Sequence, residues 1–312
     1  MATLRELIEE KNNRIETVPE AFAASVKKTQ KDIYQEILSL LDSLERDGDK
    51  IKISKKNLQI VAKINDDLKQ VVFESEYIEA VIDFAGEFDT QAIINDKYFK
   101  QAFSGFESSE IGEQIIINAK ESAVELLAGA PLDTELFNPI KETLNQSVAS
   151  GASFKDTLRQ IREIAEGSDE VEGRLLQYSK TIAKTSFGVS DRAYTNVISE
   201  ELDVEWYFYS GGLIDSSREF CIKRNGKYFH FKEIESWTTD KTSEGNPNPN
   251  GTWPGMIRGT NEQTIFINAG GWNCNHSIMP VGVASVPKEV IQRNISNGNY
   301  KPTEKEEEIL EL

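Results

Sequence analysis

The rarest residues of this chain are confined to one stretch, and this constrains its fold more than any other sequence feature. None of the first 203 residues is tryptophan, cysteine or histidine. All four tryptophans, both cysteines and both histidines of the 312-residue chain lie between positions 206 and 276. A change in composition of this kind indicates a domain boundary near position 203. The 15 phenylalanines and four tryptophans also exclude a disordered chain.

The charge of the chain is divided at the same place. Residues 1–203 carry 38 acidic and 24 basic side chains, residues 204–293 carry nine of each, and the tail from position 294 carries five acidic and two basic ones. The net charge of −17 argues against coating of nucleic-acid phosphates and against docking on anionic membranes. We therefore expect no sequence-specific nucleic-acid binding and no membrane association. An acidic surface favours basic protein partners instead.

The first 203 residues have the apolar periodicity of helices. Pro19 suits the first turn of a helix, and Ser54 and Ser153 suit N-caps, the latter with Asp156 three residues later in a capping-box pattern. Gly167 is expected to end the helix that Ser153 begins. The predicted helices span 19–47, 54–71, 76–86, 89–103, 110–127, 133–150, 153–166 and 170–200.

Beyond Asp203 the sequence becomes β-prone. Strands are predicted at 204–209, 264–268 and 278–286, an Asn225-Gly226 hairpin turn precedes the aromatic run 228–231, and 244–251 is an exposed loop. The sequence therefore predicts an α+β protein in which short antiparallel strands follow a helical region. Its predicted parts are a helical region (1–150), bridging helices (151–203), a compact β-rich domain (204–293) and an acidic tail (294–312).

Two short cysteine-containing segments flank the predicted hairpin and loop. In the first, an aspartate, small hydroxyl residues and an arginine precede the cysteine; the second reads Gly-Trp-Asn-Cys-Asn-His and leads into an apolar stretch. This pattern resembles the C-terminal domain of phage head morphogenesis proteins of the Mu F type, also called minor capsid proteins. The resemblance covers about residues 150–285. The matching positions are Asp215, Arg218, Cys221, Asn225, Gly226, Gly271, Trp272, Cys274 and His276, whereas Asn275 replaces the basic residue of many relatives.

The resemblance implies a structural protein of the virion that has no enzymatic step. Such proteins associate with the portal during procapsid assembly in the host cytoplasm and stay at the capsid interior or portal vertex. The expected partners are the portal protein and the major capsid or scaffold protein. The motif residues would hold the C-terminal fold, and the N-terminal helices would present surfaces to partners.

The cysteines and histidines leave several interpretations open. Cys221, His230, Cys274 and His276 would form a Cys2His2 zinc set, although their spacing is unlike that of common zinc sites. Alternatively, two buried thiols lie close together with His276 hydrogen-bonded nearby and no cofactor, or Cys221 and Cys274 form a disulfide in a released virion.

The runner-up function is a virion-packaged effector enzyme, a hydrolase or transferase with a site around Asp215, Arg218, Cys274 and His276. Cys274 and His276 alternate along a strand-like segment and would point the same way. Against catalysis, Asp215 fits a turn clamp that accepts hydrogen bonds from the backbone N–H of Ser217 or Arg218. The sequence contains no phosphate-binding loop, dinucleotide fingerprint or EF-hand loop.

Overall fold

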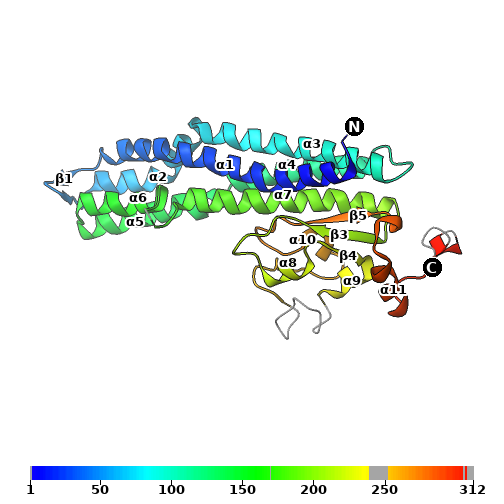
Figure 1. Ribbon diagram of the computed structural model, residues 1–312. Helices are drawn as coiled ribbons and strands as arrows, with labels where there is room; N and C mark the ends of the chain where they lie inside the picture. The colour runs from blue at the N-terminus through cyan, green and yellow to red at the C-terminus, as the bar shows by residue number, and fades with distance from the viewer. Residues whose placement is uncertain (1, 169, 239–251, 305, 308–312) are drawn as a thin grey trace. The chain divides into compact units, whose positions relative to one another are not determined.

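The computed structural model describes residues 2–168, 170–238, 252–304 and 306–307. It confirms the predicted class: a helical N-terminal region precedes a small C-terminal region with short antiparallel strands (Figure 1). The elements are α1 (Leu4–Leu41), β1 (Arg46–Asp47), β2 (Lys50–Ile51), α2 (Lys55–Glu74), α3 (Glu76–Ala102), α4 (Glu110–Ala128), the π-helical turn η1 (Asp133–Phe137), α5 (Asn138–Ser150), α6 (Phe154–Ala165), α7 (Arg174–Glu201), β3 (Trp206–Ser210), α8 (Glu219–Arg224), β4 (Lys227–His230), α9 (Phe231–Ser236), α10 (Ile265–Asn268), β5 (Ser277–Val281), the 3-10 turn η2 (Val283–Ser285) and α11 (Lys288–Ser296).

The chain forms two compact units, and each combines segments that are distant in sequence. We call them the helical unit (18–86 and 120–183) and the C-terminal unit (1–17, 87–119 and 184–312). The sequence-based boundaries at 150, 203 and 293 follow chain order instead, and they stay predictions. The predicted loop 244–251 and most of the tail beyond residue 304 lie outside the described residues.

Helix starts in the helical unit follow their predicted caps. The Ser54 hydroxyl accepts a hydrogen bond from the Asn57 N–H at 3.2 Å, and the Ser153 hydroxyl accepts one from the Asp156 N–H at 3.1 Å. Each serine satisfies a backbone donor that the first helical turn leaves unpaired. The unit's core includes Phe22 stacked on Phe84, with ring centroids 4.9 Å apart.

Two helix predictions are wrong in their extent, and one predicted strand is a helix. α1 begins at Leu4 and continues through Pro19, because Leu7, Lys11 and Ile15 already form a buried stripe ahead of the proline. The patterns at 76–86 and 89–103 belong to the single helix α3. The segment 264–268 forms the short helix α10 rather than a strand, since the Asn261 side chain accepts the N–H groups of residues 263 and 264 and starts a helical turn.

Asn225 and Gly226 do not form a β-hairpin turn. Asn225 caps the C-terminus of α8, and Gly226, with φ of +75°, turns the chain directly into β4. Gly226 provides this left-handed conformation at no steric cost. Its N–H donates to the carbonyl of Tyr209 at 2.8 Å, so β4 pairs with β3 rather than with a segment just before it.

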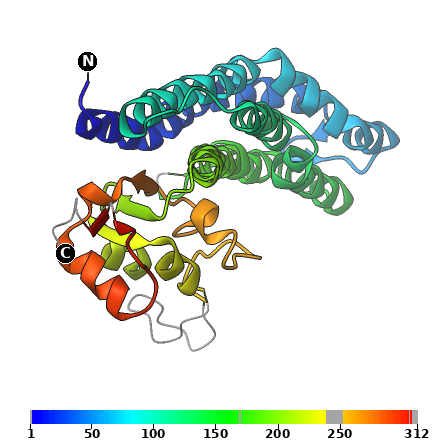
Figure 2. The ribbon, with the colours of Figure 1, turned by 90° about the vertical axis from the view of Figure 1, so that its right-hand side faces the viewer.

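The C-terminal unit contains a three-stranded antiparallel sheet in the order β4-β3-β5. β5 ends at Val281, earlier than the predicted 286. Figure 2 shows the sheet between the C-terminal half of α7 and the helices α8, α9 and α11. Because side chains alternate along a strand, Tyr207 and Tyr209 pack in one core with Cys221 and Cys274, whereas Trp206 packs in another core with Val281, Val286, Ile291 and Tyr300.

Candidate metal centre

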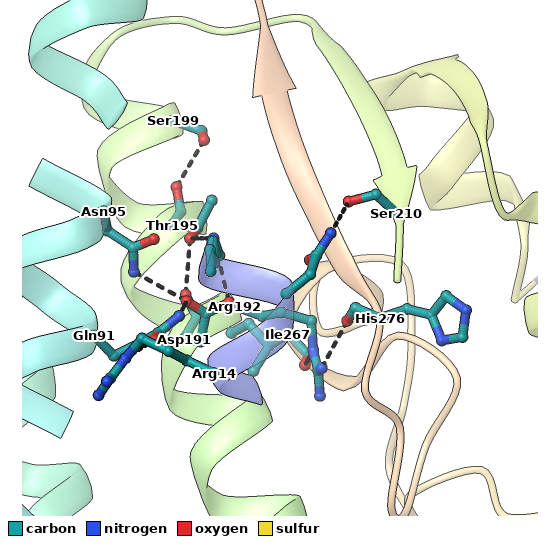
Figure 3. Close-up of polar contacts among 12 residues, drawn as sticks. Arg14, Gln91, Asn95, Asp191, Arg192, Thr195, Ser199, Ser210, Ile267 and His276 are labelled. Carbon is teal, nitrogen blue, oxygen red and sulfur yellow. Dashed lines mark hydrogen bonds and ion pairs between the residues drawn. The ribbon is translucent and has the colours of Figure 1, made fainter. Parts of the chain in front are cut away.

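A buried polar network joins three helices of the C-terminal unit at Asp191 of α7. One carboxylate oxygen of Asp191 accepts hydrogen bonds from the side-chain amides of Gln91 and Asn95, both at 3.0 Å and both from α3 (Figure 3). Its other oxygen lies 3.2 Å from the Lys11 ammonium of α1, which also donates to Thr195 at 2.9 Å. The network thus gives both of its buried charges, Lys11 and Asp191, an oppositely charged partner.

Lys11 and Asp191 are almost fully buried, with exposed side-chain fractions of 1% and 0%. Burial lowers the pKa of Lys11, and the charge of Asp191 opposes that shift. Sequence reasoning missed this pair. The available signal was a charged residue on the apolar stripe of a helix, because Asp191 follows Phe187 by four residues and precedes Tyr194 by three.

Arg192, the next residue of α7, holds the backbone around the cysteine and histidine segment. Its Nε donates to the carbonyl of Ile267 at 2.6 Å, and its Nη1 donates to the carbonyl of His276 at 2.9 Å (Figure 3). The same Nη1 also donates to the carbonyl of Cys274 at 3.2 Å. A guanidinium has five donors in a fixed plane, which suits it to bind several carbonyls at once. Arg192 therefore anchors the segment that carries Cys274 and His276 to α7.

Three buried metal-binding side chains lie together beside this segment. Cys221 on α8 and Cys274 have their sulfur atoms 3.9 Å apart, and His276 Nδ1 lies 3.9 Å from the sulfur of Cys274. All three ligand atoms lie within 4.8 Å of one another, and each residue is at most 4% exposed. The expectation that Cys274 and His276 point the same way is confirmed.

Gly270 and Tyr209 complete the surroundings of the two sulfurs. A Cβ atom at position 270 would lie 2.5 Å from the Cys221 sulfur and 2.9 Å from the Cys274 sulfur, so only glycine leaves this space open. The Tyr209 hydroxyl on β3 lies 3.4 Å from the Cys221 sulfur and 3.9 Å from the Cys274 sulfur. Its ring stacks on His276, with centroids 5.2 Å apart.

The two thiols differ in acidity. The hydrogen bond between Cys221 and Cys274, together with burial, raises the pKa of Cys221. The same hydrogen bond lowers the pKa of Cys274, assisted by His276 and by the nearby charge of Arg192. Burial raises the pKa of Tyr209 well above its usual value, so its hydroxyl stays protonated.

The cluster of Cys221, Cys274 and His276 can hold a metal ion. Tetrahedral zinc with Zn–S bonds of about 2.3 Å places two sulfurs about 3.8 Å apart. The observed sulfur separation of 3.9 Å agrees with that value. The donor set, two thiolates and one imidazole, is one that zinc prefers.

His230 does not join this cluster, so the four-residue zinc set is corrected to three. His230 pairs with Trp206 across β4 and β3, and its ring lies 5.0 Å from that of Trp206 and 5.8 Å from that of Tyr300. Trp206 and Tyr209 are three positions apart on β3, so they face opposite sides of the sheet. His230 therefore belongs to the core opposite the two cysteines.

His230 is expected to make the protein less stable in acid. Its side chain is fully buried and its Nδ1 accepts the Lys232 N–H at 3.4 Å; burial, with the charge of Lys232, lowers the pKa of His230 to about 4. The unfolded chain binds this proton from about pH 6.5, so stability falls between about pH 6.5 and about pH 4, by roughly 3 kcal/mol. Glu205, 3.8 Å away, is half exposed and offsets little of this loss.

Urea unfolding of the wild type and of His230→Asn measures this effect, because asparagine keeps an N-cap acceptor without the titration. Between about pH 7 and about pH 4, the wild type should lose more stability than the variant. Equal losses in both proteins would show that His230 does not cause the acid sensitivity.

The remaining motif residues are placed apart from the metal-binding cluster. Arg218 donates to the carbonyls of Gly270 and Trp272. Gly271 has a positive φ of +97°, and a Cβ atom at this position would collide with the carbonyl of Gly255. Trp272 is 43% exposed. These contacts fix the loop that precedes Cys274.

Asp215 is not the predicted turn clamp. It is exposed and forms no hydrogen bond or ion pair with the described part of the chain. Ser217 closes this turn instead: its hydroxyl accepts the Ile214 N–H at 2.8 Å, and its own N–H donates to the Ile214 carbonyl at 2.8 Å.

Comparisons with protein-family models, with curated proteins and with solved structures found no match. Among the helices of the described residues, none has the length and apolar character needed to cross a membrane.

Proposed function

We propose that this chain is a phage minor capsid protein that associates with the portal during head assembly and stays in the virion. The observation that carries the proposal is the role of the motif residues. Cys221, Cys274 and His276 come from two segments about 50 residues apart and pack into one buried cluster, while Arg218 binds carbonyls of the loop that precedes Cys274. Their contacts are with backbone carbonyls and with one another, which is how residues that define a fold are used.

The same contacts give little support to the alternative of a virion-packaged hydrolase or transferase. The Arg218 guanidinium donates hydrogen bonds to backbone carbonyls, and Cys274 and His276 are at most 4% exposed. Asp215 points to no partner among the described residues. A catalytic group must reach substrate, so this arrangement favours a binding role.

Charge indicates the kind of partner surface. Residues 1–203 carry the excess of acidic side chains, whereas residues 204–293 are neutral. The acidic helices would therefore meet a basic surface of the portal, major capsid or scaffold protein. During assembly the protein would act in the host cytoplasm, away from direct contact with specific DNA sequences.

We further infer that the cluster binds a zinc ion and that this ion stabilises the C-terminal unit. A cytosolic assembly pathway keeps thiols reduced, and reduced paired cysteines with a histidine bind zinc well. The ion would join α8 to the segment before β5, which are connected in sequence only through more than 50 residues. Such a link stabilises the fold and performs no reaction.

Co-purification with the portal protein from the same genome tests the proposed function, with cross-linking to locate the contact. We expect a stable complex with cross-links to acidic residues of the helices. An Asp215→Ala variant is the matched control, because that side chain is exposed and should leave both folding and portal binding unchanged. If Asp215→Ala and His276→Ala fold and enter particles but abolish a measurable activity, the effector enzyme is correct and the structural proposal fails.

A further inference from the structure

The neutral C-terminal region contains a pocket that is strongly basic, in a chain whose net charge is −17. A cavity of about 490 Å³ lies among α8, β4, α9 and α11. Its charged lining consists of five cations and one carboxylate: Lys223, Arg224, Lys227, Lys232, Arg293 and Glu233. We call these residues the basic pocket. A volume in this range is typical of small-molecule sites.

Arg224 is the buried member of the basic pocket. It is 3% exposed, and its guanidinium lies 3.9 Å from the ring centroid of Phe220 and 4.4 Å from that of Trp237. Its Nη1 donates to the Phe220 carbonyl at 3.0 Å, but its buried Nε has no hydrogen-bond partner. A buried guanidinium donor without an acceptor is costly, and an anion in the cavity would satisfy it.

The charges of the pocket are only partly neutralised within the protein. Arg293 pairs with Glu233 at 2.9 Å, and Lys223 pairs with Glu219 at 3.2 Å. Arg224, Lys227 and Lys232 form no ion pair with the described residues. The Glu233 carboxylate also accepts hydrogen bonds from the Asn294 side-chain amide and from the His230 N–H. The pocket therefore keeps a clear excess of positive charge: Glu233 is its one lining carboxylate, and Lys232 also interacts at longer range with Glu205 and Glu235.

The chemistry of the lining favours phosphate over other anions. Ser236, Asn297 and Asn299 also line the cavity and add neutral hydroxyl and amide groups to the cations. A carboxylate brings one charge, and an acidic peptide spreads its charges along an extended chain at about 3.3 Å per residue. A phosphate or diphosphate concentrates two or more charges in a compact group, and arginine and lysine are its usual ligands.

We propose that the basic pocket binds a compact, multiply charged phosphate anion, either inorganic pyrophosphate or the phosphate chain of a nucleotide. Arg224 would hold one phosphate oxygen through its Nε at the buried end, and Lys227 and Lys232 would neutralise the anion from the exposed side. This proposal goes beyond the proposed capsid role and does not depend on it.

Isothermal titration of the full chain with pyrophosphate, ATP and adenosine tests the proposal at fixed salt. Pyrophosphate and ATP should bind saturably at one site, and adenosine should not bind. Lys227→Gln with Lys232→Gln should raise the Kd about tenfold, because charge-assisted hydrogen bonds to phosphate are strong ones. Both lysines are exposed, so the thermal melting temperature of the ligand-free protein should not change.

Two further variants sharpen the result. Lys56→Gln with Lys63→Gln removes the same two charges from exposed positions of α2 and should leave the Kd unchanged. Arg224→Lys keeps the positive charge but removes the Nε donor, so it should weaken binding while the protein still folds. Equal binding by the wild type and the Lys227/Lys232 variant, or binding only of an acidic peptide or duplex DNA, would overturn the proposal. Failure here would leave portal association untouched.

Discussion

Replacing Asp191 with asparagine is expected to destabilise the protein by about 3–5 kcal/mol, the cost of breaking a buried ion pair. The variant keeps an oxygen that accepts from Gln91 and Asn95, but it leaves the Lys11 ammonium buried without a counter-charge. Lys11 must then be desolvated unpaired or lose its proton. Urea unfolding at neutral pH measures the loss.

Two controls separate this effect from a general loss of charge. Glu76→Gln removes one partner of the exposed Lys28–Glu76 pair, whose side chains are 75% and 63% exposed, and should cost less than about 1 kcal/mol. Adding Lys11→Met to Asp191→Asn removes the unpaired cation and should recover most of the lost stability. If Asp191→Asn costs no more than Glu76→Gln, the network does not hold the C-terminal unit together.

The second large effect is expected from the metal centre. The purified protein should contain one zinc ion per chain, and Cys274→Ser should abolish zinc binding. Bound metal stabilises a fold by mass action, by about 4 kcal/mol when free zinc is about a thousandfold above its Kd. Chelation of the wild type should therefore lower its thermal melting temperature to that of Cys274→Ser, and chelation should not affect the variant.

His230→Asn is the matched control for this experiment. It replaces a histidine on the opposite face of the sheet, so the variant should retain stoichiometric zinc. Loss of zinc in His230→Asn would show instead that His230 is a zinc ligand together with Cys221, Cys274 and His276. A wild-type protein free of zinc after purification under reducing conditions would contradict the zinc assignment.

The sequence predicts those features that depend on neighbouring residues. The caps at Ser54 and Ser153 each need only a hydroxyl and an N–H three residues later, and both form. Cys274 and His276 are two residues apart in an extended segment, and their side chains do meet. The division into helical and strand-bearing regions follows from apolar periodicity alone.

Features that depend on distant residues were not predicted. α1 extends to Leu4 because Lys11 is buried against Asp191, 180 positions away, and no local pattern indicates that partner. The Asn225-Gly226 signal is common to hairpins and to helix ends, and only the pairing of β4 with β3 decides between them. His230 was grouped with the cysteines because the side of the sheet that it faces depends on strand register.

The most direct test of the proposed function is mass spectrometry of procapsids and DNA-filled heads made from the genome that encodes this chain. A portal-associated minor capsid protein should be present in both particles, at a constant and small number of copies relative to the portal. If the chain is abundant in infected cells but absent from both purified particles, the proposed function is wrong.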